Sequence, residues 1–188
     1  MKTIKIITFL IFATTCTGLI AQDSGVNEKY GNTLNLGLGI GYYGYIGQSI
    51  PVVMLNYEFD IAKSFTLAPF IGAYTYSKGY YWGDKNNAYK DYYYRETVIP
   101  VGMKGTYYFD NLLKASSKWD FYVAGSLGFA ITQTTWDSGY YGDKNIYRRA
   151  NPLYANVHIG SEFHISQKFG IFLDLSSGVS TFGFAFHL

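Results

Sequence analysis

Cysteine, proline and charge are scarce in this sequence, and each shortage excludes a class of protein. The 188 residues include one cysteine and 4 prolines, and 15% of them are charged, against about 25% in an ordinary soluble domain. A single cysteine excludes an internal disulfide framework. Lys and Arg number 15 and Asp and Glu number 13, so no strongly basic face is expected and no nucleic-acid partner is predicted.

Long apolar runs are scarce as well. Beyond the N-terminal stretch there is no run of about 18 apolar residues, the length that a membrane-spanning helix needs. A chain of this kind can cross a membrane only with strands that close into a barrel. The sequence is instead rich in rings and glycine, with 20 tyrosines, 14 phenylalanines and 21 glycines. This composition is typical of a barrel whose outer surface faces lipid.

The first 21 residues resemble a secretory signal peptide, with two early lysines, an apolar stretch and an exit of small residues. We expect cleavage after Ala21, which leaves a short polar segment at 22–32 and a barrel domain at 33–188. The alternative is lipidation at Cys16, because the residues before it resemble a weak lipoprotein box. In both cases the mature protein is exported.

Apolar residues alternate with small or polar ones through most of the mature chain, as at Leu34, Leu36 and Leu38. A period of two indicates strands with one apolar face. The pattern predicts an all-β fold, an eight-stranded antiparallel up-and-down transmembrane β-barrel. Its expected strands are 33–46, 51–61, 65–76, 96–109, 119–133, 152–165, 169–176 and 179–188.

The predicted connections differ in length from one end of the barrel to the other. Two of them, 77–95 and 134–151, are long, whereas 62–64 and 166–168 are tight turns. Outer-membrane barrels have short periplasmic turns and longer external loops. We therefore expect both chain termini in the periplasm. A soluble calycin-type barrel is the competing fold, but it would need a charged exterior.

One strand carries a recognisable motif. The segment Ile99-Pro100-Val101-Gly102-Met103-Lys104-Gly105 resembles a strand of small outer-membrane barrels from Bacteroidetes, within the OmpA/OmpX-like eight-stranded family. The resemblance implies outer-membrane lipid and lipopolysaccharide as surroundings. It also implies insertion by the outer-membrane assembly machinery, which acts through the C-terminal strand. Such strands usually end on Phe, and this one ends on Leu188.

Four charged residues are expected on the inward face of the barrel: Lys104, Glu58, Glu162 and Asp174. An eight-stranded barrel is about filled by its own side chains, and buried charges there must pair. We predict an ion-pair network around Lys104, with Glu58 or Glu162 as its partner, that closes the lumen.

No catalytic, cofactor or metal site is predicted from the sequence. His158 and Glu162 share a strand face but lie about 13 Å apart, too far to share a metal ion. His164 and His187 fall at strand ends on the periplasmic side, and no Ser-His-acid spacing accompanies His158.

The two long loops share a tyrosine-rich motif, Gly79–Asn86 and Gly139–Asn145. Their rings either anchor the barrel at the lipopolysaccharide interface or bind an extracellular glycan or protein. The predicted function is a non-enzymatic outer-membrane protein with a structural or surface-interaction role. The alternatives are a small pore or transport accessory and, less favoured, a lipid A-modifying enzyme. The candidate binding residues are Tyr80, Tyr81, Trp82, Trp136, Tyr140 and Tyr141.

Overall fold

The computed structural model describes residues 30–41, 49–113, 115–144 and 152–188. Within these ranges the chain forms eight strands and one four-residue helix, α2 (Asp110–Leu113). The strands are β1 (Thr33–Gly41), β2 (Ser49–Ala62), β3 (Phe65–Trp82), β4 (Lys90–Tyr108), β5 (Trp119–Trp136), β6 (Leu153–Ser166), β7 (Phe169–Ser176) and β8 (Val179–His187).

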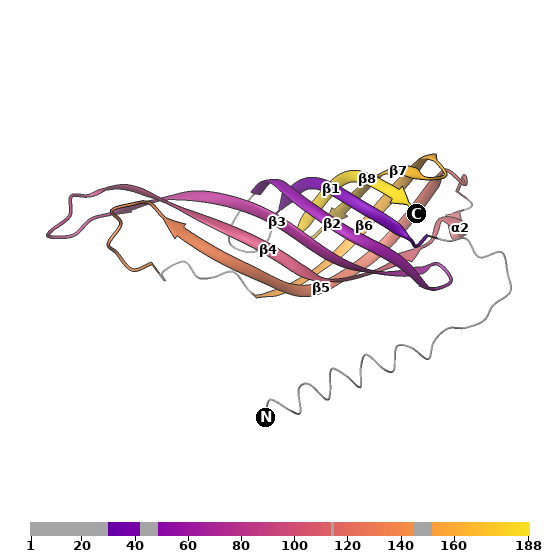
Figure 1. Cartoon of the computed structure of the whole chain (residues 1–188), viewed down its shortest axis with the longest axis horizontal. Coiled ribbons are helices and arrows are strands. Elements are labelled where there is room, and N and C mark those ends of the chain that lie inside the picture. The colour runs from indigo at the N-terminus through magenta and orange to yellow at the C-terminus, as the bar shows by residue number, and fades with distance from the viewer. Residues whose placement is uncertain (1–29, 42–48, 114, 145–151) are drawn as a thin grey trace, which may run out of the picture.

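The strands form one closed barrel in which each pairs antiparallel with the next and β8 pairs with β1 (Figure 1). The closing register sets Leu36 opposite Leu55 on one side and opposite Phe184 on the other. Apolar alternation therefore matches across the seam. The predicted eight-stranded antiparallel barrel is confirmed. The predicted signal peptide and its cleavage site lie outside the described residues.

The two ends of the barrel differ. At the end that we call proximal, Thr33 pairs with His187, and the C-terminus and α2 lie there (Figure 1). At the opposite, distal end, β3, β4 and β5 extend beyond the other strands as a projecting wall (Figure 1).

The outer face of the barrel is apolar and exposed. Leu127, Phe129 and Val157 are 61%, 66% and 70% exposed, whereas the inward Glu58 and Lys104 are buried. A soluble barrel has the reverse arrangement, so the fold is that of a transmembrane β-barrel. Among the described residues, no helix is long and apolar enough to span a bilayer.

The strand ends at the distal side were predicted wrongly. Residues 77–82, 90–95 and 134–136 were assigned to loops but belong to β3, β4 and β5. Ladder pairs from Ser77↔Arg95 to Trp82↔Lys90 continue to the end of β3. The prediction failed because both faces of this stretch carry aromatic or polar residues, so no apolar face marks it as a strand. The expected continuation of the first strand over residues 42–46 lies outside the described residues.

Candidate functional site

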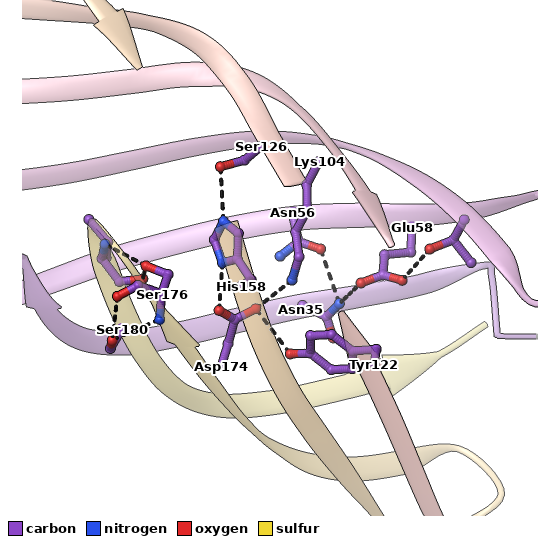
Figure 2. A network of polar contacts seen from close by, with 12 residues as sticks. Asn35, Asn56, Glu58, Lys104, Tyr122, Ser126, His158, Asp174, Ser176 and Ser180 are labelled. Atoms are coloured by element: carbon purple, nitrogen blue, oxygen red, sulfur yellow. Dashed lines mark hydrogen bonds and ion pairs between the residues drawn. The ribbon is translucent and has the colours of Figure 1, made fainter. Parts of the chain in front are cut away.

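A buried ion pair crosses the middle of the lumen. Lys104 Nζ on β4 lies 2.5 Å from Asp174 Oδ2 on β7, and both side chains are buried (Figure 2). The hydroxyl of Tyr122 donates to the same carboxylate oxygen at 3.0 Å, and the ammonium group lies 4.7 Å from the centroid of that tyrosine ring. Each charge thus has a partner of opposite sign, which a buried charge requires.

The second oxygen of Asp174 continues the network into a serine–histidine pair. His158 Nδ1 lies 2.6 Å from Asp174 Oδ1, and Ser126 Oγ lies 2.9 Å from His158 Nε2 (Figure 2). These contacts have the geometry of a Ser-His-Asp triad. The prediction that no such set accompanies His158 is therefore wrong. The three residues are 32 and 16 positions apart in the sequence and meet through the register of β5, β6 and β7.

The surroundings of Ser126 limit what this triad can do. The serine is buried, and the small cavity beside it is lined both by apolar side chains such as Phe70 and Phe172 and by the polar groups of the network itself. In hydrolysis the serine oxygen attacks the carbonyl carbon of a bound substrate. Hydrogen-bond donors must then stabilise the oxyanion that forms. What the described geometry provides is a fixed chain of hydrogen bonds from β5 through β6 to β7.

Glu58 is satisfied by neutral donors. Tyr108 and Thr66 donate their hydroxyls to Oε2 at 2.7 and 2.8 Å, and the Asn35 amide donates to Oε1 at 3.1 Å. The ion-pair partner of Lys104 is thus Asp174 rather than Glu58 or Glu162. The sequence could not decide among these acids, because alternation gives the face of a residue but not its partner across the lumen.

On the projecting wall, the outward face changes from apolar to polar at one row of residues. Ile99 and Ile131 pair on β4 and β5. The next outward row is Thr75, Thr97 and Gln133, with the two threonine hydroxyls 3.1 Å apart. Beyond that row the outward positions are polar or aromatic, apart from Gly79. We call this row the boundary row.

The inward face of the wall carries an aromatic cluster, which is the set Tyr80, Trp82, Tyr92, Tyr94, Trp136 and Tyr140. Trp136 stacks on Tyr140 with centroids 4.1 Å apart, and Trp82 meets Tyr140 edge-on at 5.1 Å. Tyr140 is only 2% exposed. The two copies of the tyrosine-rich motif therefore pack on each other, through Tyr80 and Trp82 at the end of β3 and Tyr140 in the loop after β5.

The six candidate binding residues divide into two groups. Tyr80, Trp82, Trp136 and Tyr140 belong to the aromatic cluster. Tyr81 and Tyr141 are 64% and 76% exposed. Two further exposed tyrosines that were not predicted, Tyr89 and Tyr93, lie on the same wall.

A polar groove lies on the wall beside Tyr93. Its lining includes Ser77, Arg95, Thr135 and Asp137. The backbone of Asp137 donates to Tyr93 O at 2.9 Å, and the Asp137 carboxylate accepts from Tyr93 N at 2.8 Å. Asp137 thus lengthens the sheet by one residue beyond β5. Sequence analysis missed this groove because its residues come from three strands and share no motif.

The tip of the β3–β4 hairpin is closed by Asp84. Its carboxylate accepts hydrogen bonds from the backbone of Asn86 and Asn87, each at 2.8 Å, and from the Asn87 amide at 2.9 Å. These bonds favour the ionised form and lower the pKa of Asp84. The Gly-Asp-Lys-Asn sequence is therefore a turn-forming motif here.

Comparison with known proteins gives structural neighbours only. No family model and no curated protein matches the chain. Neisserial surface protein A has a TM-score of 0.50 at 9% identity, over 83% of this chain and 95% of that chain. A de novo designed transmembrane β-barrel has a TM-score of 0.47 at 11% identity, over 86% and 99%. Ail of Yersinia pestis, solved with the heparin analogue sucrose octasulfate, has 0.45 at 7%, over 82% and 94%.

The likeness to Neisserial surface protein A is a likeness of fold. It identifies the architecture as that of the small outer-membrane β-barrels. The narrower resemblance to Bacteroidetes barrels stays a prediction.

Proposed function

We propose that this outer-membrane barrel is not an enzyme, that both of its termini lie in the periplasm, and that its projecting wall binds a ligand outside the cell. One observation carries the proposal. The outward face of the wall turns polar at the boundary row, yet the three strands continue beyond it.

The boundary row sets how far the wall rises. From Thr75 to the end of β3 at Trp82 the chain stays extended, which is a length of about 25 Å along the strand. Outward positions in this part, such as Ser77 and Arg95, are exposed and polar. Polar side chains do not face hydrocarbon, so this part of the wall stands above the lipid.

The outer surface of the wall is suited to binding because it is rigid. The aromatic cluster packs against the inward face of the strands and holds them in place. Tyr81 and Tyr93 therefore extend outward from a rigid sheet. Tyrosine side chains on a rigid support lose little conformational entropy when a ligand binds. Rings of this kind stack on sugars and form protein hot spots.

The groove adds a positive charge to those rings. Arg95 lies one outward row below Tyr93, and Gly79 opposite Tyr93 has no side chain to cover the ring. A guanidinium group recognises phosphate, sulfate and carboxylate. The ligand class that fits best is therefore a saccharide with negative charge, either the core of lipopolysaccharide or an extracellular glycan.

A binding experiment tests the proposal on the mature protein in phospholipid nanodiscs free of lipopolysaccharide. The probes are purified lipopolysaccharide and a panel of acidic and neutral oligosaccharides. We expect binding of acidic probes, at least tenfold weaker after Tyr93→Ser or Arg95→Gln. Tyr107→Ser is the matched control, since Tyr107 is an exposed tyrosine near the proximal end.

The outcomes separate the two sources of the ligand. Binding of lipopolysaccharide alone assigns the groove to the membrane surface, and binding of other acidic glycans assigns it to an external partner. Binding that Tyr107→Ser weakens as much as Tyr93→Ser would contradict the proposal, as would failure of every saccharide to bind. Capture of a protein ligand instead would reject the saccharide class.

A further inference from the structure

Three metal-ligating side chains meet at the proximal mouth of the lumen, far from the projecting wall. Glu162 and His164 come from β6, and His187 comes from β8. One ligand atom from each lies within 4.8 Å of the other two. We propose that these residues form a binding site for a divalent transition metal ion, with Zn²⁺ as the best match. The site is independent of the proposed surface function.

A glycine lets the side chains meet across an intervening strand. β7 lies between β6 and β8, and its Gly170 pairs with His164 on one side and Ala185 on the other. A Cβ atom at position 170 would collide with the carboxylate of Glu162. The missing side chain thus leaves the passage through which Glu162 reaches His187. A glycine inside a strand often marks such a close approach.

The hydrogen bonds of His187 determine which of its two ring nitrogens has the lone pair that can bind a metal ion. The Thr33 hydroxyl donates to the carbonyl of Tyr30 at 3.0 Å, so its oxygen accepts from His187 Nδ1 at 2.9 Å. The neutral ring then has its lone pair on Nε2, which lies 2.7 Å from Glu162 Oε1. A proton between these two atoms makes the contact a hydrogen bond. A zinc ion that takes the place of the proton moves the two atoms apart, because Zn–N and Zn–O bonds are each about 2.0–2.2 Å long.

His164 is oriented by the carboxylate of Asp120, as His187 is by the hydroxyl of Thr33. Its Nε2 lies 2.8 Å from Asp120 Oδ2, so the proton of the neutral ring is on Nε2 and the lone pair is on Nδ1. Nδ1 lies 4.0 Å from Glu162 Oε1. Metal-binding histidines usually donate their other ring N–H to a carboxylate or similar acceptor, and that outer bond sets the tautomer. Both histidines here have such a partner.

The ligand set decides the class of metal. Two imidazole nitrogens and one carboxylate, with a fourth position for water, is a known zinc arrangement. Imidazole also suits Cu²⁺ and Ni²⁺, which compete for such sites. The side chains of His164 and His187 are 23% and 17% exposed, so water reaches the fourth position. Shifts of about 1 Å bring the ligand atoms to zinc-binding distances.

Metal binding at this place would link β6 to β8. β8 pairs with β1 to close the barrel, so the bound ion would hold the closing strand at its C-terminal end. Metal that binds only the folded state raises its stability.

The test uses the mature protein, without a histidine tag, refolded in detergent and titrated with Zn²⁺ by calorimetry. We expect one ion per chain and a higher unfolding temperature with Zn²⁺. His187→Asn and Glu162→Gln should each weaken binding by at least tenfold, and Asp120→Asn by about 10- to 100-fold. Heat-dependent gel mobility shows whether each variant folds.

His158→Asn is the matched control, because His158 is the third histidine of the chain and lies in the lumen network away from the site. It should leave Zn²⁺ affinity unchanged. A second measurement uses the wild-type protein alone. Zn²⁺ should protect His187 from modification by diethyl pyrocarbonate. No Zn²⁺ binding, equal losses in His158→Asn and His187→Asn, or no protection of His187 would each overturn the proposal.

Discussion

The carboxylate of Asp174 receives donors from Lys104, Tyr122 and His158. In a hydrolytic triad the acid mainly serves the histidine, and it stabilises the imidazolium that forms when the serine is deprotonated. Here the same carboxylate already neutralises a buried ammonium group. The Ser126–His158–Asp174 set therefore fits a structural link between strands better than an activated nucleophile.

This interpretation predicts that a fluorophosphonate probe does not label Ser126 in the folded barrel. Ser126 is buried, and its hydroxyl is held by His158 at 2.9 Å. Mass spectrometry of the treated protein checks the result, with the denatured protein as reference. Labelling of wild type that disappears in both Ser126→Ala and His158→Asn would show a reactive serine and would refute the non-enzymatic proposal.

The turn at Asp84 predicts a dependence on pH. Hydrogen bonds from Asn86 and Asn87 lower the pKa of Asp84 below its ordinary value of 3.8. A lowered folded-state pKa adds stability that is present above the ordinary value and is lost as the pH falls through the folded-state pKa. The amide signals of Asn86 and Asn87 should therefore titrate below pH 3.8.

NMR spectra of the protein in detergent, recorded over a range of acid pH, measure this titration. Asp84→Asn should abolish it while leaving the signals of the lumen unchanged. A midpoint at or above the ordinary value would show that the turn does not stabilise the carboxylate.

Strands were predictable from sequence wherever one face carries apolar side chains and the other carries small or polar ones. Alternation at Leu34–Leu38 and at Phe182–Phe186 faces lipid on one side, and β1 and β8 are where it placed them. Alternation says nothing of partners, because these depend on register. Ser126 meets His158, and Glu162 meets His187, only once the strands are paired. Gly170 gives no sign in sequence that a carboxylate crosses above it.

The projecting wall owes its rigidity to rings that come from strands and a loop together. Tyr140 lies in the loop after β5 and is nearly fully buried against Trp136, Trp82 and Tyr92. A two- or three-stranded sheet without a core is marginal in water. The aromatic cluster supplies the buried surface that the wall otherwise lacks.

Tyr140→Ala should therefore loosen the wall without affecting the barrel. Removal of a buried ring costs about 3 kcal/mol, which corresponds to roughly a hundredfold faster amide exchange where opening is local. Hydrogen exchange of residues 77–82 and 90–95 measures the effect, with β7 as an internal reference. Tyr141→Ala is the control, since that ring is 76% exposed. Equal effects of the two variants would contradict a role for the aromatic cluster.

Within the described residues, buried side chains occupy most of the lumen, and the charged groups at its centre are paired. Lys104 with Asp174 lies at mid-height, Glu58 and its donors lie toward the proximal end, and Val52, Phe70 and Tyr154 pack in a buried cluster. An eight-stranded barrel leaves an interior just wide enough for such filling. Ions would have to displace buried, paired groups in order to pass.

The whole protein is accordingly expected not to conduct. The measurement is single-channel recording in planar bilayers with protein whose gel mobility changes on boiling, which shows a folded barrel. Asp174→Asn should still not open a steady channel, because the apolar cluster of Val52, Phe70 and Tyr154 remains. A steady conductance in the wild type would favour the pore alternative.

The unequal strand lengths also make one side of the barrel taller than the opposite side. β3, β4 and β5 rise beyond the boundary row. On the opposite side, β7 and β8 have only eight and nine residues, and a turn at Ser177 and Gly178 joins them. A large ligand that approaches from the side of β7 meets the inner face of the wall and not the groove at Tyr93. Productive encounters therefore come from one sector of the membrane plane. The association rate of a large ligand would then depend on how fast each barrel rotates about the membrane normal. Neighbouring proteins that restrict this rotation would lower the rate.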